Sequence, residues 1–147
     1  MGVTRYDLME LAHDEAKGIL QVSWSDDLSV ESDRFLQTVV YLFTTIQQQK
    51  VSHLIIDSGL PAGGVLTEEV IQSFIHHIPH TPLKHIAILE SPDYLWDNNL
   101  LQVISLLITT YRLPIAIELV KDRTAAREWF SRTMQRTSVP KAGKAEN

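Results

Sequence analysis

The sequence predicts an α/β fold in which helices cover a mixed β-sheet. Two short strand-like segments near the N-terminus are separated by a polar turn that ends in glycine, which is typical of an antiparallel hairpin. After a long amphipathic segment, strand-like and helix-like segments alternate three times, which is typical of parallel strands joined by helical crossovers. The predicted order is ββαβαβαβα, with about five strands in the sheet and about four helices.

The predicted strands are short apolar or alternating segments bounded by turn residues. The first two are joined by residues 13–18, where Gly18 can adopt the positive φ that a tight turn requires. The third and fourth are almost entirely apolar, as expected for strands that are covered on both faces. The five segments are residues 8–12, 19–24, 54–57, 86–89 and 115–120.

The first two predicted helices follow residues that can cap a helix N-terminus. Ser29 is the predicted N-cap of the first, with Glu31 in its first turn, and an apolar stripe then runs as far as residue 46. Thr67 is the predicted N-cap of the second helix, which we expect to stop at Pro79 because proline disrupts a helix interior.

The last two predicted helices are different in character. Ser91 is the predicted N-cap of the third helix, whose residues 98–111 carry an apolar stripe wider than one sheet face requires. Asp122 is the predicted N-cap of the fourth. Apolar periodicity ends at about Thr137, so we expect residues 1–136 to form a single domain and residues 137–147 a disordered tail.

Composition excludes several classes of function. The formal net charge of -5 argues against nucleic acid as a partner, because such proteins usually present a basic face. The chain has no cysteine, so it has neither a disulfide framework nor a thiolate site. The N-terminus does not read as a secretory signal, and the longest apolar helix segment, residues 100–108, is shorter than the ~20 residues that span a bilayer. We therefore expect a cytoplasmic protein without a membrane span.

Candidate functional residues lie where ligands bind open α/β sheets, in the loops at the carboxyl ends of the parallel strands. Asp57 and Ser58 follow the third predicted strand, and Tyr94, Leu95 and Trp96 follow the fourth. We expect these five residues to form a contact surface, with Trp96 and Tyr94 as anchors because large aromatic residues dominate interface energetics. The wide apolar stripe over residues 100–108 suggests a homodimer as one way to cover it.

Several segments together resemble STAS-like proteins of the anti-sigma-factor-antagonist type, which are small bacterial domains. The resemblance rests on Tyr6, Trp24 and residues 14–20, 54–57, 66–69, 85–89 and 125–130. It implies a STAS-like fold and a regulatory role exerted by binding another protein. It also implies a phosphorylation site at Ser58, because phosphorylated antagonists carry a serine after an aspartate at the end of a central strand. Here residues 61–64 separate that serine from the next helix, whereas the family motif opens the helix directly.

A response-regulator receiver is an alternative interpretation. Asp26, Asp27, Asp57, Ser91 and Lys121 occur in the order of an acidic pair, a phosphoacceptor, a hydroxyl and a lysine. In that case Asp57 would accept a phosphoryl group with the help of a carboxylate-bound magnesium ion. However, receivers have a further strand and helix before the phosphoacceptor strand, and they lack the opening hairpin.

No catalytic or metal-binding motif is complete. Residues 59–64 have the glycine spacing of a phosphate-binding loop, but valine and leucine follow where lysine and serine or threonine are required. His76, His77 and His80 form a cluster, which we interpret as surface histidines near a helix C-terminus. We therefore expect a non-enzymatic module without a cofactor that binds a partner protein or a second copy of itself. A small apolar or lipid-like ligand between helices and sheet is a further alternative.

Overall fold

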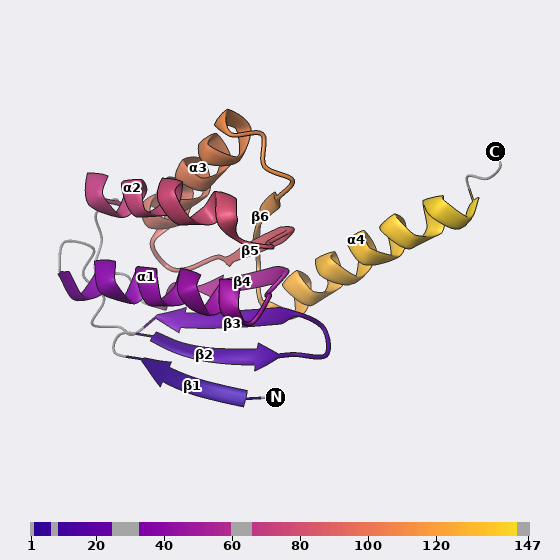
Figure 1. Ribbon diagram of the computed structural model, residues 1–147, viewed down its shortest axis with the longest axis horizontal. Coiled ribbons are helices and arrows are strands. Elements are labelled where there is room, and N and C mark those ends of the chain that lie inside the picture. Colours follow the sequence, from indigo (N-terminus) through magenta and orange to yellow (C-terminus); the bar gives the residue numbers. More distant parts are fainter. Residues whose placement is uncertain (1, 7–8, 25–32, 60–65, 144–147) are drawn as a thin grey trace.

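Six strands form one mixed sheet in the computed structural model of this chain (Figure 1). The structure describes residues 2–6, 9–24, 33–59 and 66–143, and side chains in the last helix are described as far as Thr133. The strand order follows the sequence, and β1, β2 and β3 pair antiparallel whereas β3 to β6 pair parallel. The strands are β1 Gly2–Tyr6, β2 Met9–Asp14, β3 Ile19–Trp24, β4 His53–Asp57, β5 His85–Leu89 and β6 Ala116–Val120.

The helices are divided unequally between the two faces of the sheet. Each parallel crossover adds the next strand on the same side of the previous one, so crossovers of one handedness must all pass over one face. The three crossover helices therefore cover one face, and α4, which follows the last strand, packs against the other. The helices are α1 Asp33–Gln48, α2 Glu68–His77 with the 3-10 turn η1 Ile78–His80, α3 Tyr94–Thr110 and α4 Arg123–Gly143.

The predicted mixed α/β sheet with an antiparallel hairpin and four helices is confirmed, and one strand was missed. β1 adds a sixth strand at the edge, in register from Gly2↔His13 to Tyr6↔Met9. It is held by its ladder to β2 and leaves Val3 exposed, so it has none of the alternating burial by which strands are recognised in sequence.

The hairpin turn between β2 and β3 requires glycine for two reasons. Gly18 has a φ of +67°, which residues with a Cβ atom rarely adopt. A Cβ atom at this position would also lie 2.8 Å from the Ser52 hydroxyl oxygen. The turn therefore packs closely against the segment that leads into β4.

Helix N-termini agree with the sequence at two positions and differ at a third. The Thr67 hydroxyl accepts a hydrogen bond from the Val70 amide at 3.3 Å, and the Asp122 carboxylate accepts one from the Ala125 amide at 2.9 Å, as predicted. The N-cap of α3 is Asp93 and not Ser91, because the Asp93 carboxylate accepts from the Trp96 amide at 3.0 Å. The predicted cap Ser29 and the residue Glu31 lie outside the described residues.

Alternation along the strands gives the sheet two separate hydrophobic interiors. Residues such as Leu54, Ile56, Ile86 and Ile88 point towards α1, α2 and α3 and form the larger core. Their neighbours point the other way, towards α4, and form a smaller core; it comprises Ile19, Ile55, Ala87, Leu89, Val120, Ala126 and Phe130. We call the two sides the three-helix face and the α4 face.

Helix α4 is longer than the sequence pattern predicts. Its ribbon continues to Gly143, away from the sheet, so part of the segment 137–147 expected to be disordered is helical (Figure 1). Propagating a helix that already exists is much easier than starting one, so helical structure can continue beyond the last apolar residue that packs. Residues 144–147 lie outside the described residues.

Within the described part of the chain, no helix combines the length and apolar character needed to cross a membrane.

Candidate functional site

Asp57, at the carboxyl end of β4, forms an ion pair on the α4 face. One carboxylate oxygen accepts a hydrogen bond from the Arg123 guanidinium at 2.7 Å, and the other accepts one from the Gly59 amide at 3.0 Å. Arg123 is the first residue of α4. Asp57 therefore attaches the start of α4 to the end of β4.

Ser58, the next residue, is buried on the opposite side of the sheet. Its hydroxyl oxygen accepts a hydrogen bond from the indole Nε1–H of Trp96 at 2.9 Å. Ser58 is 1% exposed and Trp96 is 2% exposed. The pair joins β4 to α3 inside the core, so a kinase would reach this hydroxyl only after the indole had moved.

The five predicted contact residues therefore do not form one surface. Trp96, the expected anchor, is a core residue, and Ser58 is buried beside it. Tyr94 and Leu95, in the first turn of α3, are each 73% exposed. Helical spacing explains the difference, because Trp96 points to the sheet and the two preceding residues point away from it.

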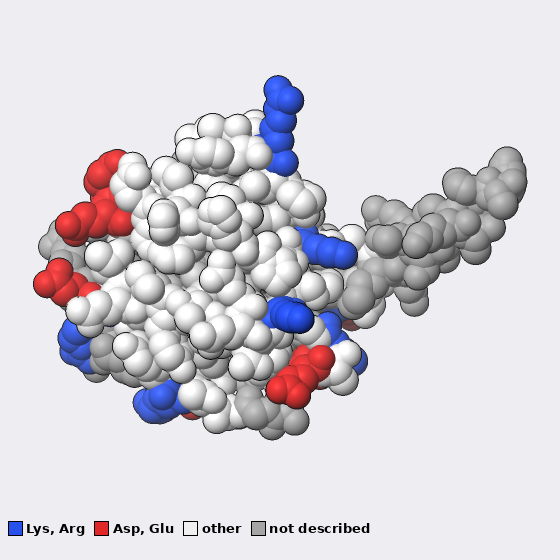
Figure 2. Space-filling view, viewed as in Figure 1, with Lys and Arg blue, Asp and Glu red and all other residues white. Residues whose placement is uncertain are grey.

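Tyr94 and Leu95 belong to a larger surface feature, which is recognised in the sequence by residue types that are absent from three helical segments. Residues 35–48 of α1, 70–77 of α2 and 94–110 of α3 contain no lysine, arginine or glutamate. We call this set the uncharged helical layer. In Figure 2 the face over α1 and α2 is largely free of charged side chains, which lie at its margins.

The single carboxylate within the uncharged helical layer does not reach its surface. Asp97 is buried, and its carboxylate accepts hydrogen bonds from the Ser91 amide at 2.7 Å and the Ser91 hydroxyl at 2.8 Å. The exposed positions of the layer carry apolar and neutral polar side chains. They include Val40, Gln37, Gln72, Leu95, Gln102, Leu106 and Thr109.

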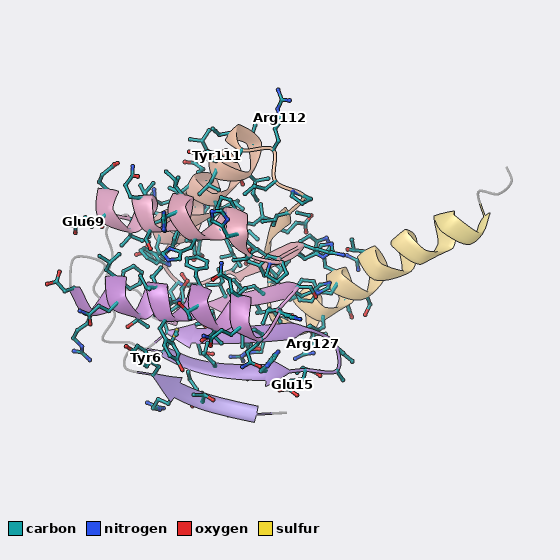
Figure 3. The ribbon with its side chains drawn as sticks, in the orientation of Figure 1. Tyr6, Glu15, Glu69, Tyr111, Arg112 and Arg127 are labelled. Atoms are coloured by element: carbon teal, nitrogen blue, oxygen red, sulfur yellow. The ribbon has the colours of Figure 1, made fainter. Side chains whose placement is uncertain are left out.

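Charged side chains are instead found at the two ends of the layer. Asp33, Glu68 and Glu69 are exposed where α1 and α2 begin, together with Arg34. Lys50, Lys84 and Arg112 are exposed beyond the opposite ends of the helices. Figure 3 shows Glu69 and Arg112 at these two ends.

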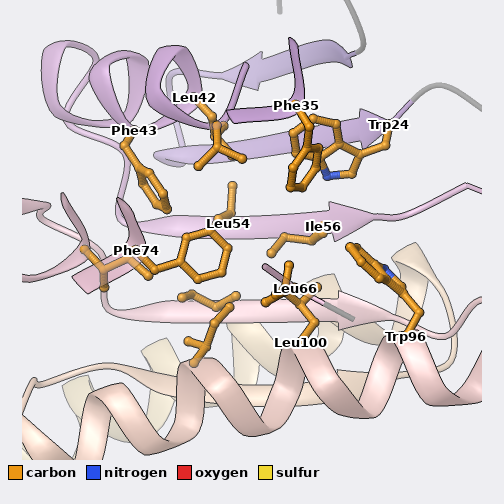
Figure 4. Close-up of a pocket in the computed structure, with 14 residues that line it drawn as sticks. Trp24, Phe35, Leu42, Phe43, Leu54, Ile56, Leu66, Phe74, Trp96 and Leu100 are labelled. Carbon is orange, nitrogen blue, oxygen red and sulfur yellow. The ribbon is translucent and has the colours of Figure 1, made fainter. Parts of the chain in front are cut away.

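A small apolar cavity lies beneath the layer, between the helices and the sheet (Figure 4). Its volume is about 40 Å³, which is enough for a few small atoms but not for an acyl chain. Apolar cavities of this kind remain dry and can bind small apolar guests. Its walls are formed by Trp24, Phe35, Val39, Leu42, Phe43, Leu54, Ile56, Leu66, Phe74, Ile78, Ile86, Trp96, Leu100 and Ile104.

Two histidines lie side by side beneath α4 on the other face. The rings of His53 and His85, on neighbouring strands, stack at 4.8 Å between centroids, and Phe130 packs edge-on against His53 at 4.9 Å. Burial, the neighbouring His85 and Lys84 together lower the pKa of His53 to about 4. Burial and Lys84 likewise lower the pKa of His85. Both rings are therefore neutral at pH 7.

The histidine pair has unused hydrogen-bonding capacity. The Ser52 hydroxyl lies 2.7 Å from His53 Nδ1, whereas His53 Nε2 and His85 Nδ1 have no partner. Both side chains are buried under α4. Their position suits a role in packing α4 against the sheet, and sequence reasoning missed them because a histidine in a strand gives no sign of its burial.

The receiver-like residues are not assembled into one site. Asp57 pairs with Arg123 and not with Lys121, and the Ser91 hydroxyl donates to Asp97. Asp26 and Asp27 lie outside the described residues, as does most of the glycine-rich loop 59–64.

The histidine cluster also lacks the arrangement of a metal site. His76 and His77 pack against each other at 5.0 Å, and His77 also stacks on Phe43. Among the residues that the structure describes, no group of three or more histidine, aspartate or glutamate side chains is placed to hold a metal ion.

Comparisons of this chain with protein-family models, with curated proteins and with solved structures found no match.

Proposed function

We propose that this chain is a non-enzymatic interaction module that binds another protein chain through its uncharged helical layer. One observation carries the proposal: three adjacent helices expose apolar and neutral side chains and no lysine, arginine or glutamate over residues 35–48, 70–77 and 94–110. Leu106 is 68% exposed, and Tyr94 and Leu95 are more exposed still. The buried centres of protein interfaces are more apolar than the rest of the surface and are enriched in aromatic residues such as tyrosine.

The physical basis is the cost of exposing such a surface to water. Soluble domains usually carry charge on about 25–35% of their surface positions, which keeps them apart in solution. The centres of protein interfaces show the reverse pattern, with lysine, glutamate and aspartate depleted and aromatic residues enriched. Removing charge from a surface that will be covered avoids the desolvation of ions.

The resemblance to STAS-like proteins supports the same role, since proteins of that family act by binding a partner. A mixed sheet with an antiparallel start and helical crossovers agrees with that resemblance. A regulatory role in the cytoplasm is part of the proposal.

Site-specific photo-cross-linking in the cells that naturally produce this protein tests the proposal. A photoreactive amino acid at Leu106 is expected to give covalent adducts with a protein, whether a different protein or a second copy. The matched control is Ser131, an exposed position on α4, which is expected to give none. Equal adduct formation at both positions, or no adduct at Leu106, Val40 and Tyr94, would contradict the proposal.

The cavity favours a second candidate function, the binding of a small apolar ligand. The ligand would be smaller than a lipid, because the enclosed volume is about 40 Å³. Native mass spectrometry of the purified chain would detect a retained molecule, and xenon would probe the empty cavity through methyl chemical shifts. Val39→Ile, which adds a methyl group to the cavity wall, should weaken both signals. Identical signals in both proteins would exclude the cavity as the site.

A further inference from the structure

We infer that the uncharged helical layer docks onto the same layer of a second copy of this chain, about a two-fold axis that runs across the helices. This inference rests on the proposed function and names its partner. The inference is based on the distribution of charge: acidic residues predominate at one end of the layer, and basic residues lie at the other.

The direction of the helices explains why the ends differ. Because α1, α2 and α3 each connect parallel strands, all three begin at the carboxyl ends of the strands and finish at the opposite edge. The acidic end carries Asp33, Glu68 and Glu69, with Arg34, and the basic end carries Lys50, Lys84 and Arg112. Figure 2 shows mostly red side chains, with blue ones below them, at one margin of this face and mostly blue ones at the other.

Two of the basic residues occupy positions where glycine is the favoured residue. Lys50 has a φ of +54° and Arg112 a φ of +51°, both in the left-handed region. In each case the following amide closes the helix, from Val51 to the Ile46 carbonyl and from Leu113 to the Ile108 carbonyl. Side chains with a Cβ atom are strained in this conformation, so the two cations occupy positions that carry a conformational cost.

This charge separation selects one symmetric arrangement. If the two-fold axis runs across the helices, the acidic end of each copy faces the basic end of the other. If the axis runs along the helices, like charges face each other. A two-fold interface is closed, because both copies use the same surface, and it leaves no further surface for growth. The helices of the two copies would then lie antiparallel across the interface, which is also favourable for their dipoles.

The area of the layer sets the expected strength of self-association. The sixteen residues of α1 and the ten of α2 give lengths of about 24 Å and about 15 Å, and two helices packed about 10 Å apart then give a face of roughly 400 Å² per copy. The total of roughly 800 Å² from α1 and α2, before any contribution from α3, is that of a weak or transient interface. We therefore expect reversible association at micromolar concentrations that weakens with salt.

Sedimentation equilibrium of the purified chain tests this inference. From about 5 to about 500 µM at low salt, the average mass should rise from 16.7 kDa towards twice that value. Val40→Lys, at an exposed position of α1, should weaken association at least about tenfold, because it places a charge on the layer of both copies. Ser131→Lys on the α4 face is the matched control and should leave association unchanged.

A charge exchange tests the orientation. A variant with Glu68→Lys and Glu69→Lys is basic at both ends of its layer, and a variant with Lys50→Glu and Lys84→Glu is acidic at both ends. Each variant alone should associate at least about tenfold more weakly than the wild type, because like charges then face each other. An equimolar mixture should recover association as a heterodimer. Circular dichroism confirms that each variant is folded.

The outcomes separate this inference from the proposed function. A wild-type chain that stays monomeric at about 500 µM overturns self-association. The proposed function still stands in that case if cross-linking at Leu106 captures a different protein, and it falls if no adduct forms. If the chain dimerises but each charge variant associates as well as the wild type, the two-fold arrangement is overturned. It is also overturned if the mixture of the two variants does not recover association.

Discussion

The two faces of the sheet differ both in their interior side chains and in the outer surfaces of the helices that cover them. On the three-helix face, the interior is apolar and contains a small cavity, and the outer side of the helices carries no exposed charge over the uncharged helical layer. On the α4 face, the interior holds two histidines, and the outer side of the covering helix exposes Arg123, Glu128 and Arg132. The charged helix is suited to remain in water, whereas the uncharged layer is suited to be covered.

On each face of the sheet, the chemistry of the interior differs from that of the outer surface. The histidines under α4 are polar yet buried, and the side chains outside α1 and α3 are apolar yet exposed. A buried polar ring with an unpartnered nitrogen costs stability, and a contiguous exposed apolar patch is uncommon on a monomer, so both features are informative about function.

The largest effect is expected when the largest fully buried side chain of each interior is removed. Trp96→Ala should lower the free energy of unfolding by about 4–5 kcal/mol and Phe130→Ala by about 3–4 kcal/mol, because both side chains are fully packed. Urea unfolding at neutral pH gives both values. A cost below about 1 kcal/mol for Trp96→Ala would show that this indole is not a core residue and would restore it as a surface anchor.

Acid should destabilise the packing of the α4 face through its buried histidines. The folded-state pKa of His53 is about 4, below its ordinary value of 6.5, so the unfolded chain binds the proton first as pH falls. This part of the stability is complete above about pH 6.5 and declines by about 3 kcal/mol as the pH falls to about 4. His85 acts in the same direction. Urea unfolding at a series of pH values measures the slope.

The control for the pH series is His53→Gln, which cannot take up this proton. Its free energy of unfolding should depend less steeply on pH between about 4 and 6.5. An unchanged slope would show that His53 is not the group responsible.

A smaller effect is expected from the hydrogen bond that joins β4 to α3. Ser58→Ala removes the acceptor of the Trp96 N–H and should cost about 1–3 kcal/mol, because the donor remains buried without a partner. In Trp96→Phe the donor is absent, so a further Ser58→Ala change should cost less. A double-mutant cycle in urea gives the coupling, and purely additive effects would mean that the bond contributes nothing.

The smallest effect is expected at the surface of the α4 face. Asp57→Asn removes the charge that pairs with Arg123 but keeps an oxygen for the Gly59 amide, so the cost should not exceed about 1 kcal/mol. High salt should reduce the difference between wild type and variant. A loss of several kcal/mol would identify Asp57 as more than the end of an exposed ion pair.

The sequence predicted the elements that carry their own periodicity. The strands β2 to β6, the helices and the caps Thr67 and Asp122 follow from local apolar spacing and turn chemistry. The strand β1 did not, because its stability comes from pairing with β2. Boundaries at α3 were displaced because Asp93 competed with Ser91 for the capping position.

The candidate site was harder to predict than the fold. Tyr94 and Leu95 are exposed, but Trp96, which was predicted to share their surface, points inward from the same turn of α3. Ser58 and the histidines His53 and His85 acquire their surroundings from residues far away in the sequence. The sequence does show that the helical layer lacks lysine, arginine and glutamate, but motif searches look for residues that are present and do not detect such an absence.

The sequential order of the strands also bears on how the chain is made. Every strand lies beside the one synthesised just before it, so no strand must wait for a distant partner to leave the ribosome. The hairpin can form first, and each later crossover then adds one strand to a template that already exists. The molecule can therefore be built in a single direction, with β1 at one edge throughout and the most recently added strand at the other.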